Sequence, residues 1–238
     1  MQKRKIKISQ EIFKKFPQFK RGIILVKDIR IIEKNKRIKK PLNRIIEQRQ
    51  SEKEDYNEHP YLKAWDEAHI KFGSDPEQYL PSIKALLSRV MGGGGLPSIN
   101  SVVTLFNYIS IKYLVPCGGD DLNKIMGNPC LDFATGNELF TGLGSQDIEQ
   151  PARGEVIYYD DQSNQVMCRR WNWRNAEFSK ITTESQEIII NIDGINGIPQ
   201  SIIAEARDEL AELLKIHCNA NLTTDLLTGN HQEIFLSE

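Results

Sequence analysis

The sequence lacks the long apolar runs that mark membrane-spanning and secreted proteins. Its 238 residues contain no stretch of about 18 consecutive apolar residues, the length a membrane helix needs. The opening residues, Met1 to Lys7, are rich in basic side chains but lack the apolar stretch of a secretory signal. We therefore expect a protein of the cytoplasm that has no membrane partner.

Cysteine and histidine are scarce and dispersed. The four cysteines, Cys117, Cys130, Cys168 and Cys218, form no Cys-x-x-Cys pair, and the four histidines show no spacing typical of metal ligands. This pattern disfavours a zinc site and a disulfide scaffold. We expect reduced thiols and no metal.

The signature loops of nucleotide binding and covalent catalysis are also missing. The run Gly92 to Gly95 is followed by Leu96-Pro97 rather than by the Gly-Lys-Ser/Thr that ends a phosphate-binding loop. No Gly-x-Ser-x-Gly elbow occurs, and paired carboxylates cannot be chosen among 32 acidic residues. We expect no cofactor, and the catalytic residues stay unknown at this level.

Charge is abundant but unevenly distributed. Residues 1 to 50 contain 17 Lys+Arg and 4 Asp+Glu, whereas the remainder contains 14 Lys+Arg and 28 Asp+Glu. A basic segment on an acidic body can steer a polyanion such as tRNA to one side of a molecule. It can equally be a solvated helix surface. The candidates for RNA contact in this segment are Lys36, Arg37, Lys39 and Lys40.

Apolar periodicity predicts helices that cluster early in the chain and short strands that cluster late, which favours a single α+β domain spanning 1–238 with a mixed or antiparallel sheet. Helices are expected at 10–16, within 34–55, from 60 to 73, from 83 to 91, from 98 to 116 and from 201 onward. Strands are expected near 6–8, 22–26, 131–134, 138–140, 155–159, 165–173, 187–192 and 233–236.

The most unusual local feature is the run Arg169-Arg170-Trp171-Asn172-Trp173-Arg174. In a strand, alternate side chains point to opposite faces, so this run would present one basic, hydrogen-bonding face and one aromatic face. Such a strand could bind phosphates or an unstacked base. Two core tryptophans backed by exposed arginines are an equally good interpretation.

A polar residue on the third predicted helix is the other candidate. Asn107 lies three residues after Thr104 and beside Phe106 and Tyr108. It could hold a ligand amide, or it could make a structural hydrogen bond.

Several motifs together resemble a known family. The run Pro97 to Tyr108, followed by Pro116 to Leu122 and by Leu131 to Gly144, is similar to the central B-three/B-four module of phenylalanyl-tRNA synthetase beta chains. Free-standing bacterial relatives of that module look closer still. The features shared with them are Phe16-Pro17, Trp65, Pro81-Ser82, Leu96-Pro97-x-Ile99-Asn100, Gly154-Glu155 and the run Cys168 to Arg174. This resemblance covers roughly residues 6 to 215, which implies that the basic segment 1–50 is part of the domain.

The resemblance implies tRNA as a partner, with no particular protein partner indicated. In the synthetase the module hydrolyses the ester of mischarged tRNA, so a deacylase acting in trans is the implied activity. The implied candidates for binding the substrate end are Asn107, Gly118, Gly119, Arg170, Asn172, Trp173 and Asn191, and Arg169 and Arg174 are added to the candidates for RNA contact.

Two departures from the synthetase module separate two hypotheses. That module has a histidine near the position of Gly118 and a glutamate near the position of Asn191. Its preference for an amino acid is therefore not carried over. The first hypothesis is a tRNA deacylase; the alternative is a catalytically silent relative that binds RNA or an amino acid. A role in protein interaction is a third possibility.

Overall fold

The structure is a computed structural model that describes residues 3–52 and 54–236. The two ends of the predicted 1–238 domain, and residue 53 within the predicted segment 34–55, lie outside the described residues.

Helices occupy the regions where the sequence predicts them, with small shifts at their ends. They are α1 (Gln10–Lys15), α2 (Lys36–Ser51), α3 (Pro60–Lys71), α4 (Ser82–Met91), α5 (Ser101–Tyr113) and α6 (Gln200–Cys218), with short 3₁₀ turns η1 (Tyr56–Glu58) and η2 (Leu122–Lys124).

The strands form three sheets. They are β1 (Lys5–Ile8), β2 (Lys20–Lys27), β3 (Cys117–Asp121), β4 (Pro129–Phe133), β5 (Phe140–Thr141), β6 (Ile148–Glu149), β7 (Val156–Asp160), β8 (Gln165–Arg169), β9 (Arg174–Asn175), β10 (Ile188–Gly194), β11 (Asn221–Leu227) and β12 (Glu233–Phe235). A six-stranded sheet has the order β12-β1-β4-β7-β8-β9, a four-stranded sheet the order β11-β2-β10-β3, and β5 pairs with β6. The β1–β4 pair is parallel and the other named pairs are antiparallel, so the expected α+β fold with a mixed sheet is confirmed.

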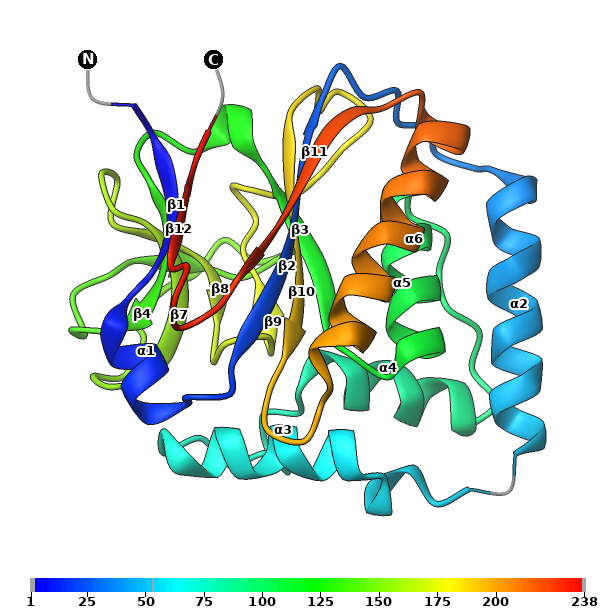
Figure 1. Ribbon diagram of the computed structural model, residues 1–238, viewed down its shortest axis with the longest axis horizontal. Helices are drawn as coiled ribbons and strands as arrows, with labels where there is room; N and C mark the ends of the chain where they lie inside the picture. Colours follow the sequence, from blue (N-terminus) through cyan, green and yellow to red (C-terminus); the bar gives the residue numbers. More distant parts are fainter. Residues whose placement is uncertain (1–2, 53, 237–238) are drawn as a thin grey trace.

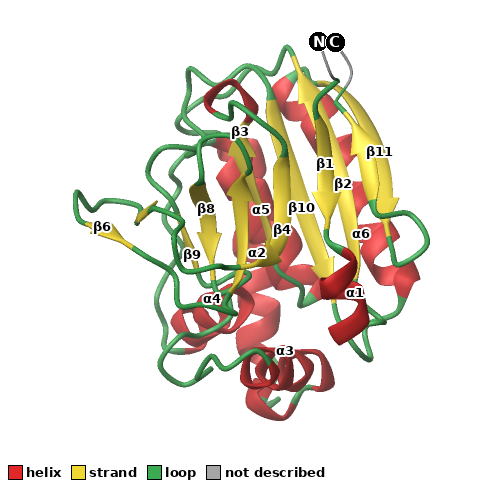
Figure 2. Ribbon diagram, turned by 90° about the vertical axis from the view of Figure 1, so that its left-hand side faces the viewer, coloured by secondary structure: helices red, strands yellow, loops and turns green. Residues whose placement is uncertain are grey.

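The four-stranded sheet is the middle layer of the molecule (Figures 1 and 2). Helices α5 and α6 cover one of its faces, α2 lies outside α5, and the six-stranded sheet lies on the other side of it. Helices α3 and α4 cross one end of these layers. The four-stranded sheet is thus covered on both faces, and the space between the two sheets can hold a site.

The sequence of β2 suits this central position. Six consecutive residues from Arg21 to Val26 are buried, as its continuous apolar run predicts for a strand covered on both sides. Gly22 lets α6 approach closely, because a Cβ atom there would lie 3.2 Å from Ile203 Cγ2.

Helix α5 begins later than the predicted start at Ser98. Asn100 is its N-cap, and the Asn100 side chain accepts a hydrogen bond of 2.9 Å from the backbone N–H of Val103. The Asn100 amide also donates to the carbonyl oxygen of Ile181 at 3.1 Å. This second bond ties the start of α5 to the segment that precedes β10.

Candidate functional site

A small pocket lies between the two larger sheets, where β3 and β10 of the four-stranded sheet face β7 and β8 of the six-stranded sheet. It encloses about 70 Å³. We call it the inter-sheet pocket, and its lining is Arg21, Ser82, Pro116, Cys117, Gly118, Gly119, Asp120, Tyr158, Cys168, Trp171, Asn172, Asn175, Asn191 and Asp193. Four of the predicted substrate-binding residues, Gly118, Gly119, Asn172 and Asn191, are brought together here.

Strand pairing explains why these residues meet. Asn191 lies opposite Gly118, and Asp193 lies opposite Arg21. Directly opposed residues share a face of a sheet, so the alternate positions 191 and 193 of β10 point to one side. Gly118 has no side chain, and a Cβ atom added there would meet no atom within 4 Å. The glycine therefore keeps the pocket open.

A buried ion pair forms one wall of the pocket. Arg21 Nε donates to Asp193 Oδ1 at 2.7 Å, and Arg21 Nη2 donates to Asp193 Oδ2 at 2.8 Å. The indole N–H of Trp171 donates to the same carboxylate at 3.2 Å. The Arg21 guanidinium also stacks over the ring of Tyr158, 4.9 Å from its centroid. Although burial opposes the charged form, the carboxylate of Asp193 raises the pKa of Arg21, so the guanidinium stays charged.

Several buried polar atoms around the pocket have no hydrogen-bond partner among residues 3–52 and 54–236. They are Arg21 Nη1, Tyr158 Oη, Asn172 Nδ2 and Asn191 Oδ1. Burial raises the pKa of Tyr158 well above its usual range, and the nearby Arg21 and Asn191 offset this only in part. Because an unsatisfied buried polar group costs about 1–3 kcal/mol, four such groups on residues that line one pocket make it the candidate binding site.

His69 orients one of these groups. Its Nε2 lies 3.4 Å from Asn172 Oδ1, so the imidazole N–H can donate to that oxygen, while Asn172 Nδ2 has no partner among the described residues. Burial lowers the pKa of His69 to about 4, so the ring is neutral near pH 7. The amide of Asn172 is thereby held without adding charge to the pocket.

Asp120 adds a carboxyl group to the lining. It is buried, and Ser179 Oγ donates to its Oδ1 at 2.7 Å. Burial, only partly offset by Ser179 and Arg21, raises the pKa of Asp120 to about 6. A carboxyl group with such a pKa can exchange a proton near neutral pH.

The predicted strand at 165–173 is wrong beyond Arg169. The chain reverses direction at Arg170 and Trp171, whose φ angles are 45° and 64°, and the segment 170–173 is a turn. The predicted alternation of a basic and an aromatic face therefore does not occur. Trp171 enters the core, where it packs edge-on against Phe16 and Trp65, while Trp173 is half-buried.

The arginines of this turn are engaged by carboxylates and aromatic rings. Arg169 is buried and donates to both oxygens of Glu155 at 2.9 Å and to Glu149 at 2.6 Å. Arg170 lies 3.7 Å from the centroid of the Tyr79 ring, and Arg174 lies 3.5 Å from Glu149. These partners neutralise much of the positive charge that the sequence shows at this place.

The other predicted residues lie elsewhere. Asn107 is half-buried on α5, and it does not line the inter-sheet pocket; Arg170 and Trp173 do not line it either. The predicted RNA-contacting residues of α2 are all exposed, and in the described part of the chain none of them forms an ion pair; they are Lys36, Arg37, Lys39 and Lys40.

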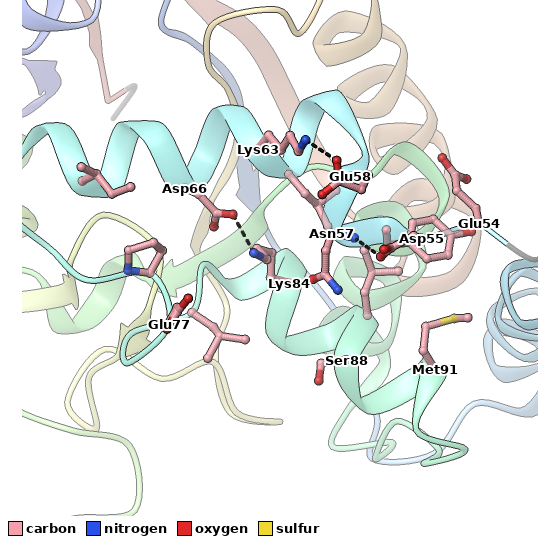
Figure 3. A pocket seen from close by; sticks show the side chains of 16 residues that line it. Glu54, Asp55, Asn57, Glu58, Lys63, Asp66, Glu77, Lys84, Ser88 and Met91 are labelled. Carbon is pink, nitrogen blue, oxygen red and sulfur yellow. Dashed lines mark hydrogen bonds and ion pairs between the residues drawn. The ribbon is translucent and has the colours of Figure 1, made fainter.

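A larger hollow of about 770 Å³ lies between α3 and α4 (Figure 3). Five carboxylates line it, at Glu54, Asp55, Glu58, Asp66 and Glu77, together with only two lysines. Each of those lysines is already paired, Lys84 with Asp66 at 2.7 Å and Lys63 with Glu58. An excess of negative charge makes this groove a poor place for the phosphates of RNA.

Neither a candidate metal centre nor a membrane-spanning helix occurs among the described residues. Within 3–52 and 54–236, no group of three or more His, Cys, Asp or Glu side chains is placed to hold a metal ion. No helix of the same part of the chain is long and apolar enough to cross a membrane.

Sequence reasoning did not select Arg21, Asp120, Tyr158 or Asp193. The available signal was a charged residue at the end of an apolar strand. Arg21 comes just before Gly22 and a run of apolar residues, and Asp193 comes just after another apolar run. A charge at such a position is buried only with a partner, but the sequence does not say which partner.

Comparison with known proteins places the chain in a family. The B3/4 domain matches residues 64–219, which confirms the resemblance drawn from the motifs. Among solved structures, the chain is similar to an N-terminal fragment of the phenylalanyl-tRNA synthetase beta-subunit from Pyrococcus horikoshii, at 12% identity and a TM-score of 0.43. The similarity covers 93% of this chain and 53% of that one, so the chain spans about half the length of that structure. No curated protein matches the chain. The match over residues 64–219 shows that the chain belongs to the B3/4 domain family.

Proposed function

We propose that this protein binds tRNA and hydrolyses the ester bond of a mischarged aminoacyl-tRNA, with the aminoacyl end held in the inter-sheet pocket. Membership of the B3/4 family supports the class of ligand. The observation that carries the proposal is that residues with unpartnered buried polar atoms line one pocket together with Gly118 and Asn191. These are the positions where the family resemblance puts the aminoacyl group.

The reaction requires water to add to the ester carbonyl, after which the bond to the ribose oxygen breaks and that oxygen takes a proton. The products are a free amino acid and uncharged tRNA. Asp120 is a carboxylate of the pocket whose pKa, raised to about 6, suits it to accept a proton from the attacking water.

Strand β3 offers a place to stabilise the developing negative charge. It is the edge strand of the four-stranded sheet, so alternate backbone groups of Cys117 to Asp121 point away from β10. Backbone N–H groups near Gly118 can therefore donate to a tetrahedral intermediate without a covalent nucleophile.

A silent aminoacyl-tRNA binder is the second candidate. It is favoured by one observation: Gly118 and Asn191 stand where the synthetase module has a histidine and a glutamate. Such a protein would hold the same end of tRNA in the same pocket and leave the ester intact.

The test is the release of amino acid from a panel of mischarged and correctly charged tRNAs, measured with the purified protein against a blank without protein. We expect selective hydrolysis of one ester or a few related ones. Gly118→Ala should lower the rate at least about tenfold, because its methyl group enters the pocket.

Gly95→Ala is the matched control. Gly95 lies outside the pocket, and a Cβ atom there also meets nothing within 4 Å, so this variant should keep the original rate. Release at the level of the blank for every tRNA, with tRNA binding retained, would replace the deacylase by the silent binder.

A further inference from the structure

We propose that the inter-sheet pocket selects an aminoacyl group with a small, uncharged side chain that both donates and accepts hydrogen bonds, namely a hydroxyl or a carboxamide. This inference rests on the proposed function only in so far as that function places an aminoacyl group in the pocket. It names a substrate class that family membership leaves open.

The unpartnered groups of the pocket include both hydrogen-bond donors and an acceptor, so they require a ligand that can accept and donate. Arg21 Nη1 and Asn172 Nδ2 are donors, Asn191 Oδ1 is an acceptor, and Tyr158 Oη can act either way; across the described residues all four lack a partner. Arg21, Tyr158 and Asn172 are at least nine-tenths buried. A hydroxyl or a carboxamide can satisfy donors and an acceptor at once.

An apolar side chain would displace water from the pocket and would form no hydrogen bond with these groups. Each donor or acceptor left unsatisfied costs about 1–3 kcal/mol, and several would be affected together. For this reason, a site built to hydrogen-bond a substrate rejects an apolar analogue of the same shape much more strongly than an apolar site rejects a polar one.

Charge disfavours an ionised side chain of either sign. Arg21 is already neutralised by two hydrogen bonds to Asp193, and Asp120 adds a second carboxyl group to the lining. An anionic side chain would therefore meet two carboxyl groups. A cationic one would have to lie beside the buried guanidinium of Arg21, a residue that lines the pocket.

Size disfavours a large side chain. The cavity of about 70 Å³ is roughly half the 150 Å³ of a cavity that accommodates benzene, and a water molecule occupies about 30 Å³ of the liquid. A pocket of this volume therefore suits a side chain of a few heavy atoms better than an aromatic ring.

The experiment measures equilibrium binding with analogues that cannot be hydrolysed. Each analogue is 3′-amino-3′-deoxyadenosine joined through an amide to an aminoacyl group, and the side chains are compared as near-isosteric pairs. We expect the threonyl analogue to bind at least about tenfold more tightly than the valyl one, and the asparaginyl analogue more tightly than the aspartyl one by a similar factor. The phenylalanyl analogue should bind weakly.

Tyr158→Phe tests the pocket itself. It removes a hydroxyl group that has no hydrogen-bond partner in the described structure, so the fold should tolerate it, while the preference for threonyl over valyl should shrink. Tyr159→Phe is the control: Tyr159 is the next residue of β7, does not line the pocket, and should leave the preference unchanged.

Two results would overturn the inference, and they differ in their meaning for the proposed function. Equal binding of all the analogues would remove the side-chain selectivity and leave the aminoacyl site in place. Binding of none of them would remove both. The binding measurement does not depend on whether the protein hydrolyses esters, because the analogues contain an amide.

Discussion

At the scale of single residues, the protonation of Asp120 makes the stability of the protein depend on pH. Burial raises its pKa from 3.8 to about 6, so the folded state holds a proton in a range where the unfolded chain has lost it. The free energy of unfolding therefore falls as pH rises from about 4 to about 6, and this contribution is constant above that range. The size of the effect is about 3 kcal/mol at most, from two pKa units.

Asp120→Asn should remove this dependence. The amide oxygen can still accept from Ser179, and no charge has to be buried. Its free energy of unfolding in urea, relative to the original protein, should rise between pH 4 and pH 6 and stay about 1–3 kcal/mol higher at pH 8. Asp147→Asn, at an exposed position, is the control and should give a difference independent of pH. A flat difference for Asp120→Asn as well would show that burial does not shift this carboxyl group.

At the scale of elements, the pair Arg21–Asp193 joins β2 to β10, and Trp171 joins the 170–173 turn to both. Removing one partner leaves a buried charge without compensation. We expect Arg21→Met to lower the free energy of unfolding by about 3–5 kcal/mol.

The double variant Arg21→Met with Asp193→Leu should recover a large part of that loss, because both charges are then gone. Urea unfolding of the two single variants and the double variant measures the coupling. Lys14→Met is the control, because its pair with Glu11 is exposed and should contribute less than about 1 kcal/mol. A loss below about 1 kcal/mol for Arg21→Met would mean that the pair does not hold the two strands together.

The same elements show how far the sequence could predict the fold and the site. Helices α3, α4 and α6 and strand β2 follow from apolar periodicity, because one face or both faces of each are buried. Strands β3 and β11 were missed: β3 begins Cys117-Gly118-Gly119, and β11 is largely exposed, so neither has an apolar pattern. Their positions are set by pairing with β10 and β2.

The prediction of a strand failed at residues 170–173 for a related reason. The composition of this segment suits a strand, but Trp171 gains more by entering an aromatic core with Phe16, Phe19 and Trp65 than by continuing the alternation. The required φ angles are unfavourable for Arg170 and Trp171, and tertiary packing offsets them. Such long-range packing leaves no local signal. Asn172, one of the predicted substrate-binding candidates, lines the same pocket as Gly118 and Asn191.

At the scale of the whole molecule, the basic helix and the pocket lie on different sides of the four-stranded sheet. Helix α2 packs against α5 on the helical side of that sheet (Figure 1). The inter-sheet pocket is lined by residues of both sheets and lies on the opposite side. If RNA contacts Lys36, Arg37, Lys39 and Lys40, it has to pass around the edge of the molecule for its end to reach the pocket. Helix α2 would then affect the binding of whole tRNA and not the binding of a short aminoacyl-adenosine analogue.

Charge reversal on α2 tests this arrangement. Replacing Lys36, Arg37, Lys39 and Lys40 by glutamate should weaken the binding of whole tRNA and reduce the slope of log affinity against log salt by about one for each phosphate that the protein no longer neutralises. Binding of the aminoacyl-adenosine analogues should not change, because these ligands are too short to touch α2.

The control carries the same change of net charge at dispersed positions. Reversing the exposed residues Lys14, Lys63, Lys124 and Lys180 should affect tRNA binding much less. If both sets weaken binding equally, general electrostatic attraction explains the effect, and α2 does not bind RNA specifically. If neither set weakens binding, the positive charge of the first 50 residues is a solvated surface that does not bind RNA. RNA must then be bound by the region around the pocket.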